Sequence, residues 1–376
     1  MTIVISAVNL RKGGTLKILN NCLEELSGYA RVGKCRLIAL VHKKELAFYE
    51  GVEYIELPWS VCSWAHRLWC EYVTMYGISK KLGDIDLWLS LHDTTPRVKA
   101  RHQAVYCHNP FPFFRWQWHH LWLNYRIVCF ALFTKWIYRI NIHRNDFIIV
   151  QSEWLREAIA KMFGLTTNRI IVFPPNDKLN VNLNPNEGFT LNSQLSTFSS
   201  KFTFIYPAWP DVHKNFECIC EAARLLEQEV GTDKFKVILT TDRNANRYCR
   251  WIDRKWGHVN SLHFAGFLDR EKLYEQYAVA GCLVFPSQVE TWGLPISEFA
   301  SMGRPMLLAD LPYAHETAMG SQLTAFFNPN NPKDLKEKMK QVMTGNFSGL
   351  HPVTPHTIQP PVVHTWHEII ELRPTF

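Results

Sequence analysis

Two series of short apolar runs, separated by amphipathic helical patterns, constrain the fold of this chain more than any other feature of its sequence. The first series of strand-like runs comprises Ile3–Leu10, Arg36–Val41, Ile85–Leu91, Ala104–Cys107, Phe147–Val150 and Ile170–Phe173. The second comprises Phe202–Tyr206, Lys236–Thr240, Leu262–Phe264, Cys282–Pro286 and Pro305–Leu308. Alternation of strands and helices is typical of parallel sheets with helices on both faces. We therefore predict an α/β fold with two Rossmann-like doubly wound domains.

A polar, turn-rich stretch between the two series marks the predicted domain boundary, and a length of 376 residues suits two domains. We place the N-terminal domain at 1–178, a linker at 179–200 and the C-terminal domain at 201–350. The remaining residues, 351–376, form a tail with a closing helix at Thr365–Leu372. Ligands of open α/β sheets bind beyond the carboxyl ends of the strands. The two domains are therefore expected to face each other across one cleft that holds the site.

Charge is divided unevenly along the chain, because residues 1–180 hold 23 Lys and Arg against 14 Asp and Glu. A basic half favours an anionic partner. No nucleic-acid-binding motif is present, so a phospholipid surface or a polyprenyl diphosphate is the expected partner. The ten cysteines form no C-x-x-C pair, no signal peptide opens the chain, and no run of about 20 apolar residues occurs. These features predict a cytoplasmic location.

The segment after the run that ends at Pro286 carries the most informative polar residues. A short loop holds Glu290 and Gly293, Pro295 suits the first turn of a helix, and Glu298 follows within that helix. Free N–H groups at such a turn, together with the helix dipole, favour a phosphate. Carboxylates accept hydrogen bonds from vicinal hydroxyl groups of a sugar or ribose. The ordinary alternative for Glu298 is a structural acid in a first helical turn.

The spacing of this segment resembles glycosyltransferase family four, whose members have the GT-B fold of two Rossmann-like domains. The motif E-x-x-G-x-P-x-x-E-x-x-x-x-G-x-P is matched by Glu290, Gly293, Pro295, Glu298, Gly303 and Pro305. The resemblance implies a nucleotide-sugar-dependent enzyme. It also places Thr291, Trp292 and Leu294, which lie between the two glutamates, among the donor-binding residues.

A second matching segment ends in Lys214 and Asn215 and is similar to the family's diphosphate-binding loop. A lysine there would neutralise the donor diphosphate and stabilise the leaving nucleotide. The family usually carries an arginine a few residues earlier, and this chain has none between 206 and 214. His213, Arg243 or Arg247 are the candidates to replace it, or Lys214 acts alone.

Three glycines and an aromatic residue complete the expected donor site. Gly266 and Phe267 resemble the segment that contacts the nucleotide base, and Gly13-Gly14 resembles the glycine loop after the first strand. Glycine at either position is also expected if the chain only makes a tight turn there, because glycine adopts turn conformations readily. The chain contains neither G-x-G-x-x-G nor a P-loop motif, which disfavours a dinucleotide oxidoreductase and a P-loop NTPase.

Two histidines follow strand-like runs of the N-terminal half. His108 matches the family's histidine that contacts the donor sugar near the reacting carbon, so we predict it to be catalytic together with Lys214 and Glu290. His92 and Asp93 are weaker candidates for acceptor binding. Either histidine could instead cap its own loop by bonding backbone.

No cofactor or metal is expected. Asp84-Ile-Asp86 is formally a D-x-D sequence, but it precedes a strand and is interpreted as a turn. No cluster of Cys, His and Asp has convincing metal-ligand spacing in the sequence, and GT-B enzymes generally need no such metal.

An aromatic segment, Phe111–Tyr138, contains eleven aromatic residues with interleaved Arg and Lys. Its charges recur too often for a membrane span. Aromatic and basic residues together suit the bilayer interface, and an amphipathic helical pair packed on the sheet is the equally weighted alternative. Both interpretations are compatible.

The resemblance implies a retaining transfer of a hexose from a nucleoside diphosphate sugar to a hydroxyl of a growing saccharide. GDP-mannose is the first choice of donor, with UDP-hexoses and dTDP-rhamnose left open. Glu290 would hold the sugar hydroxyls and Glu298 the ribose, while the leaving phosphate would help to remove the acceptor proton.

The expected setting is the assembly of lipopolysaccharide O-antigen or capsule, with an acceptor on a polyprenyl diphosphate lipid and peripheral association with the inner face of the plasma membrane. A phosphorylase would need a much longer chain, and an epimerase would need different acids. A non-catalytic saccharide- or nucleotide-binding subunit remains an alternative because of the missing arginine.

Overall fold

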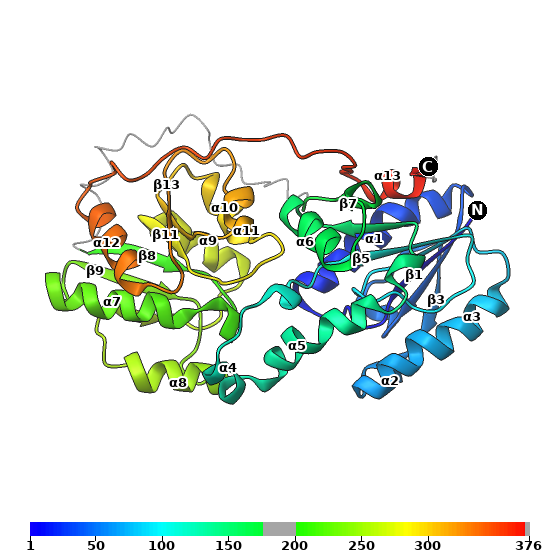
Figure 1. Cartoon of the computed structure of the whole chain (residues 1–376), viewed down its shortest axis with the longest axis horizontal. Coiled ribbons are helices and arrows are strands. Elements are labelled where there is room, and N and C mark those ends of the chain that lie inside the picture. Colours follow the sequence, from blue (N-terminus) through cyan, green and yellow to red (C-terminus); the bar gives the residue numbers. More distant parts are fainter. Residues whose placement is uncertain (176–200, 373–376) are drawn as a thin grey trace. The chain divides into compact units, whose positions relative to one another are not determined.

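The computed structural model describes residues 1–175 and 201–372 of the chain. Its contacts divide these residues into two compact units. Unit 1 contains residues 1–109, 133–175 and 358–372, and unit 2 contains residues 110–132 and 201–357. Each unit is built around one parallel sheet (Figure 1).

The sheet of unit 1 has seven strands in the order β3-β2-β1-β4-β5-β6-β7, and all its pairings are parallel. The strand order reverses between β1 and β4, which is where ligands bind in sheets of this kind. The strands are β1 (Thr2–Ala7), β2 (Arg36–Val41), β3 (Val52–Glu56), β4 (Leu87–Ser90), β5 (His102–Cys107), β6 (Phe147–Val150) and β7 (Ile170–Val172).

Both faces of this sheet are buried, as the alternation along β1 shows. Ile3 and Ile5 belong to one core cluster, whereas Val4 belongs to a second. The apolar stripe of α1, including Leu19 and Leu23, packs into the first cluster. The helices of unit 1 are α1 (Gly13–Arg31), α2 (Trp64–Trp69), α3 (Met75–Leu82), α6 (Glu153–Phe163) and α13 (Trp366–Glu371), and a π-helical turn (Cys70–Thr74) joins α2 to α3.

The sheet of unit 2 repeats this order with six parallel strands, β10-β9-β8-β11-β12-β13. The strands are β8 (Phe202–Tyr206), β9 (Phe235–Leu239), β10 (Leu262–Phe264), β11 (Cys282–Phe285), β12 (Met306–Ala309) and β13 (Thr324–Phe327). The helices are α4 (Trp118–Leu123), α7 (Phe216–Val230), α8 (Arg247–Trp256), α9 (Arg270–Val279), α10 (Leu294–Ala300), α11 (Pro312–Thr317) and α12 (Pro332–Met343). Helix α5 (Tyr125–Arg139) begins in unit 2 and ends in unit 1.

The structure confirms two Rossmann-like sheets and the strands that the apolar runs predicted, and it adds two strands that the sequence analysis missed. Strand β3 has only partly buried or exposed residues, so its apolar pattern is weak. Strand β13 is four residues long. Among the described residues, no helix has the length and apolar character required to cross a membrane.

The grouping by contacts differs from the predicted boundaries at two segments. Residues 110–132 belong to unit 2 rather than to the N-terminal half, and residues 358–372 belong to unit 1 rather than to a separate tail. The predicted linker at 179–200 lies outside the described residues. Side-chain packing, described below for each segment, accounts for both differences.

The closing helix α13 is fixed to unit 1 at its first turn. The Glu25 carboxylate accepts hydrogen bonds from the backbone N–H groups of Trp366 (3.1 Å) and His367 (2.8 Å). The Trp366 ring is 5% exposed and packs against the rings of Tyr106 (5.5 Å) and Phe173 (4.9 Å). The last described residues of the chain therefore complete the core of the first sheet.

Replacing Trp366 with alanine is expected to destabilise unit 1 by about 3–5 kcal/mol, because a buried indole leaves a large cavity. Urea unfolding followed by circular dichroism measures the loss. His364→Ala, at an exposed position just before the helix, is the control and should unfold as the wild type does. Equal midpoints for Trp366→Ala and His364→Ala would show that α13 does not contribute to the core.

Candidate functional site

The candidate donor site lies in unit 2, where the loops after β8 and β11 emerge side by side. These strands are neighbours, with Phe204 opposite Cys282, and the strand order reverses between them. Because both strands are parallel, their carboxyl ends reach the same edge of the sheet. The loop after β8 leads to α7, and the loop after β11 leads to α10.

Hydrogen bonds join the two loops into one structure. The Gln288 backbone N–H donates to the carbonyl oxygen of His213 (2.8 Å). The buried Asn215 side-chain amide donates to the carbonyl oxygens of Pro286 (3.1 Å) and Pro329 (2.8 Å). Asn215 has a left-handed backbone with φ 56°, which asparagine tolerates better than most residues. The predicted donor residue Asn215 therefore fixes the loops rather than presenting its amide to solvent.

Lys214 and Glu290, which the sequence analysis predicted to act together, form an ion pair across these loops. Their side chains are 17% and 14% exposed. Tyr206 donates its hydroxyl hydrogen bond to the Lys214 carbonyl oxygen (2.7 Å). Burial, and then the Glu290 charge, raises the pKa of both Tyr206 and Tyr313 well above the usual range. Neutral, buried tyrosines thus hold the backbone of these loops, and the ion pair keeps some exposure to solvent.

Gly293 makes the turn between the Glu290 loop and α10. Its φ of 94° is unfavourable for residues with a side chain, and an added Cβ would lie 3.3 Å from Ile296 Cδ1. The carbonyl oxygen of the preceding Trp292 accepts a hydrogen bond from the Thr317 hydroxyl. Thr291, Trp292 and Leu294 are all partly exposed around this turn. Thr291, Trp292 and Leu294 therefore lie in the same loop as Glu290.

Glu298 lies within α10, one turn beyond Leu294, and is partly exposed. It accepts a hydrogen bond from the Tyr277 hydroxyl (3.3 Å). Burial, followed by the Glu298 charge, raises the pKa of Tyr277 well above its ordinary value. Tyr277 therefore remains a neutral donor that orients the Glu298 carboxylate.

The predicted base-contacting residues lie in the loop after β10, at the same edge of the sheet as the other loops. Gly266 has a positive φ of 75°, and its N–H donates to the Thr241 carbonyl oxygen (3.2 Å). The Phe267 side chain is 77% exposed. An exposed aromatic ring beside a backbone turn suits stacking against a nucleobase.

The three candidates for the missing arginine differ in their surroundings. His213 is partly exposed, and the burial of its ring, then the nearby Lys214 charge, keeps its pKa well below the ordinary value. Arg243 pairs with Asp253 and lies over the Phe264 ring. Arg247 is exposed in the first turn of α8. His213 is therefore a neutral neighbour of Lys214, and Arg243 is already bound to an acid.

A set of contacts that was not predicted from the sequence supports the Lys214 loop. The rings of Phe111 and Phe114, from the aromatic segment, lie 5.0 and 6.2 Å from the His213 ring. The Asn124 amide donates to Asp211 Oδ1 (2.8 Å), and Asp211 also accepts from the Val212 N–H. An Asp preceding a helical turn is a recognisable cap, but its partner 87 residues away in the sequence has no local signal.

Unit 1 brings His108 and Asp93 together at the carboxyl ends of β5 and β4. Asp93 Oδ1 accepts hydrogen bonds from the backbone N–H groups of His108 (2.6 Å) and Asn109 (3.0 Å). His108 Nε2 lies 3.5 Å from Asp93 Oδ2. Asp93, with φ 67°, is the residue that fixes the His108 loop. Gly13 and Gly14 are exposed at the start of α1, after the neighbouring strand β1.

His92 is placed differently from His108. It is fully buried within unit 1, where its ring contacts Thr94 Oγ1 (2.9 Å) and lies 3.4 Å from the buried Glu71 carboxylate. Burial, then the Arg67 charge, lowers the pKa of His92 well below its ordinary value. These side-chain contacts hold the His92 ring inside unit 1.

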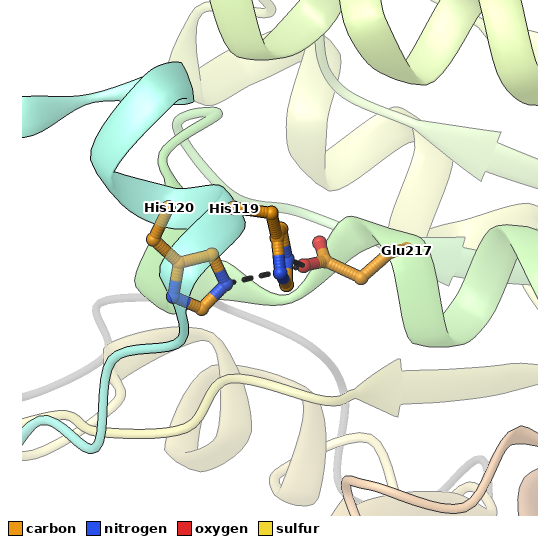
Figure 2. Close-up of side chains that lie close together, drawn as sticks. All are labelled: His119, His120 and Glu217. Atoms are coloured by element: carbon orange, nitrogen blue, oxygen red, sulfur yellow. Dashed lines mark hydrogen bonds and ion pairs between the residues drawn. The ribbon is translucent and has the colours of Figure 1, made fainter.

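Among the described residues, one group has metal-ligand composition: His119, His120 and Glu217, whose ligand atoms all lie within 4.8 Å of one another (Figure 2). His119 Nε2 and His120 Nε2 lie 3.4 and 3.5 Å from the same oxygen, Glu217 Oε1. The Tyr248 hydroxyl donates to the other carboxylate oxygen. Burial opposes the charge of Glu217, but these three donors outweigh it and lower the pKa of Glu217 to about 2.

The hydrogen bonds of His120 indicate that it binds the Glu217 carboxylate rather than a metal cation. His120 Nδ1 accepts a hydrogen bond from the Gln117 backbone N–H (3.0 Å), so the neutral ring carries its proton on Nε2. That proton points toward Glu217, whereas a metal would need a lone pair there, with the other ring nitrogen donating. The cluster therefore attaches α4 to α7 through the Glu217 charge. The absence of a metal requirement stays a prediction.

Comparisons with known proteins identify the class of enzyme that this chain resembles. Residues 201–345 match the family model described as glycosyl transferases group 1. These residues form a glycosyltransferase domain. The chain is also 21% identical, over 266 residues, to the O-antigen chain mannosyltransferase RfbU of Salmonella typhimurium. That match covers 70% of this chain and 66% of RfbU, just under two thirds of its length.

Solved structures extend the similarity to both units. A structure of WaaG, a glycosyltransferase involved in lipopolysaccharide biosynthesis, has a TM-score of 0.61 at 13% identity, covering 91% of this chain and 90% of WaaG. A structure of Anabaena Alr3699/HepE in complex with UDP-glucose has a TM-score of 0.60 at 13% identity. The match covers 93% of this chain and 92% of Alr3699/HepE. The glycosyltransferase domain and its partner unit therefore have the GT-B fold that the sequence predicted.

Glu217→Gln is expected to lower the stability of the glycosyltransferase domain by roughly 3 kcal/mol near pH 7, the energy of the pKa depression from 4.5 to about 2. A carboxyl group whose pKa is lowered by folding stabilises the folded protein at pH values above the pKa of the unfolded chain. The difference in stability between Glu217→Gln and the wild type should therefore shrink as the pH falls from about 4.5 toward about 2. Thermal unfolding over a pH series measures it.

The matched control for this measurement is Glu229→Gln, at the other end of α7, where Glu229 pairs with Lys336 and Lys340 at the surface. Solvent screens these surface ion pairs, so their loss should lower the stability much less than the loss of the Glu217 charge. Two outcomes would contradict a stabilising role of the buried Glu217 carboxylate: equal losses of stability from the two substitutions, or a loss from Glu217→Gln that does not change with pH.

Proposed function

We propose that the protein is a retaining glycosyltransferase of family four. It transfers a hexose from a nucleoside diphosphate sugar, GDP-mannose as first choice, to a hydroxyl of a lipid-linked saccharide in lipopolysaccharide O-antigen or capsule assembly. The observation that carries the proposal is the Lys214–Glu290 ion pair, formed where the strand order of the glycosyltransferase domain reverses. Two residues with the charges needed for a diphosphate and for sugar hydroxyls meet there from separate loops.

Donor binding would exchange the partners of this pair. The Lys214 ammonium would bind the donor diphosphate, and the freed Glu290 carboxylate would accept hydrogen bonds from hydroxyls of the sugar. Backbone N–H groups of the turn at Gly293 would add to phosphate binding. Glu298, oriented by Tyr277, would accept the ribose hydroxyls, with the base against Gly266 and Phe267.

The proposed reaction proceeds on one face of the sugar. The bond between the anomeric carbon and the diphosphate oxygen breaks, the acceptor oxygen forms a bond to the same carbon, and the acceptor proton passes to an oxygen of the leaving diphosphate. A nucleoside diphosphate leaves, and the anomeric configuration is retained. Lys214 stabilises the charge that develops on the leaving group, which is where a preorganised cation lowers the barrier.

His108 is proposed to contact the donor sugar near the reacting carbon, on the basis of the family resemblance. Two contacts support a fixed position for it: Asp93 accepts the His108 backbone N–H, and its second oxygen lies 3.5 Å from the ring. Gly13 and Gly14, at the neighbouring β1 loop, leave open space in which backbone can approach a phosphate or an acceptor.

The biological setting rests on similarity to named proteins. RfbU is named as an O-antigen chain mannosyltransferase, which favours a mannose donor and a lipid-linked acceptor. The complexes of Alr3699/HepE with UDP-glucose keep UDP-hexoses as the main alternative donors. An acceptor on a polyprenyl diphosphate places the enzyme in the cytoplasm at the inner face of the plasma membrane.

A donor panel tests the assignment of the sugar nucleotide. Purified protein is incubated with GDP-mannose, UDP-glucose, UDP-galactose or dTDP-rhamnose, and membrane-extracted acceptor lipid is added. Nucleotide release and product mass are measured, and the linkage is determined by NMR. We expect release with GDP-mannose and an axial, retained linkage. Binding of a donor without any release in the presence of acceptor would favour the non-catalytic subunit, and an inverted product would overturn the mechanism.

Substitution of the ion pair tests the site itself. Lys214→Gln and Glu290→Gln are each expected to lower kcat/KM for the donor by about 10²–10³, the usual loss for one group that stabilises developing charge. Lys336→Gln, a lysine paired with Glu229 on the surface of α12, is the control. Thermal midpoints establish that the variants fold. Wild-type turnover by folded Lys214→Gln and Glu290→Gln proteins would remove the pair from the mechanism.

A further inference from the structure

The loop that carries Glu290 is held at both ends by hydroxyl groups of one short helix, α11. Tyr313 donates a hydrogen bond from its hydroxyl to the carbonyl oxygen of Ser287 (2.6 Å). Thr317, one turn further along the same helix, donates from its hydroxyl to the Trp292 carbonyl oxygen. The two accepting carbonyl groups lie three residues before and two residues after Glu290. Helix α11 therefore fixes the backbone on either side of this glutamate.

Both hydroxyl donors of α11 are buried. Tyr313 is 2% exposed and Thr317 is 5% exposed, and Ser287, which accepts from Tyr313, is 0% exposed. Burial, and then the Glu290 charge, raises the pKa of Tyr313 well above its usual range, so its hydroxyl stays protonated and able to donate. Because water cannot readily replace a donor at the buried Ser287 carbonyl, the loss of this hydrogen bond is costly.

Helix α11 is itself part of the packed interior of unit 2. The Tyr313 ring lies 6.4 Å from the ring of Phe285, the last residue of β11, and Ala314 is fully buried. The helix contacts α10, which follows the Glu290 loop in the chain (Figure 1). A loop that is bonded to a buried helix at two points has little conformational freedom. The entropy of ordering the Glu290 loop is therefore lost on folding rather than on ligand binding.

The second carboxylate of the proposed donor site has a separate anchor. Glu298 accepts its hydrogen bond from the hydroxyl of Tyr277, which belongs to α9 and is 0% exposed. Tyr313 and Thr317 instead bond to the loop of Glu290. Hydroxyl groups from two different helices thus fix the surroundings of the two carboxylates. The effects of the two anchors can therefore be separated by substitutions that remove one hydroxyl group at a time.

We propose that Tyr313 and Thr317 are positioning residues for the hexose of the donor: by fixing the loop on both sides of Glu290, they set the affinity for the sugar and leave that for the nucleotide unchanged. This inference rests on the proposed function, in which Glu290 accepts hydrogen bonds from the sugar hydroxyls. Such hydrogen bonds weaken steeply when their geometry is lost, so a loop that moves binds the sugar less well.

Calorimetric titration of the full-length protein tests this division of the donor. Dissociation constants are measured for GDP-mannose and GDP, and for UDP-glucose and UDP, with the wild type and the double variant Tyr313→Phe, Thr317→Val. Each substitution removes a hydroxyl group and keeps a side chain of similar shape. For the donor that the wild type binds, we expect the affinity of the nucleotide sugar relative to its free nucleotide to fall about tenfold, the effect of losing one or two hydrogen bonds.

Two single substitutions make this measurement specific. Tyr277→Phe should weaken the nucleotide and the nucleotide sugar to the same extent, because Glu298 is proposed to bind the ribose that both contain. Tyr54→Phe is the matched control, since the Tyr54 hydroxyl donates to the Ala47 carbonyl oxygen (2.9 Å) in unit 1, and it should change no dissociation constant. An unchanged affinity ratio in the double variant, or equal losses for nucleotide and nucleotide sugar, would overturn the inference.

Amide hydrogen exchange without any ligand separates this inference from the proposed function. Peptides that cover residues 287–293 should exchange about fivefold faster or more in the double variant, the effect of one lost hydrogen bond, while those of α12 keep the wild-type rate. Unchanged exchange of residues 287–293 would show that α11 does not fix the loop. Faster exchange together with a wild type that binds no sugar nucleotide would support the loop anchor and overturn the proposed function instead.

Discussion

The ion pair between Lys214 and Glu290 is the interaction on which the proposed donor site depends. Two loops 76 residues apart in sequence meet because β8 and β11 are adjacent, and they are fixed by Asn215 and Gln288. Beneath them, buried tyrosines stay neutral and hold the backbone. In the proposed function, each charge neutralises the other until a ligand with both phosphate and hydroxyl groups separates them. This gives the proposed selectivity for a nucleoside diphosphate sugar a physical basis.

A second important feature is the buried Glu217 carboxylate, which holds helix α4 in place. Glu217 is held charged by two histidines and a tyrosine, and it attaches α4 to α7. The neighbouring contacts of Phe111 and Asn124 reach the Lys214 loop itself. Helix α4 and the Lys214 loop therefore belong to the same unit, unit 2.

Much of this could be predicted from local sequence patterns. Apolar runs predicted the sheets, and the family resemblance carried by the segment from Glu290 to Pro305 implied the GT-B fold, which the comparisons confirmed. The donor loop that the same segment predicted stays a prediction. Long-range polar contacts could not be predicted, because Asn124–Asp211 and His119–Glu217 join residues about 90 positions apart without a local signal. For the same reason, the sequence could not predict that residues 110–132 belong to unit 2. The roles of Lys214, Glu290 and His108 stay predictions.

A crystal structure with a bound nucleoside diphosphate tests the central claim most directly. The account predicts that Lys214 Nζ leaves Glu290 and contacts the diphosphate, that Glu298 accepts the ribose hydroxyls, and that Glu290 faces the space where the sugar would lie. A nucleotide bound elsewhere in the protein, or one bound beside an intact Lys214–Glu290 pair, would contradict it.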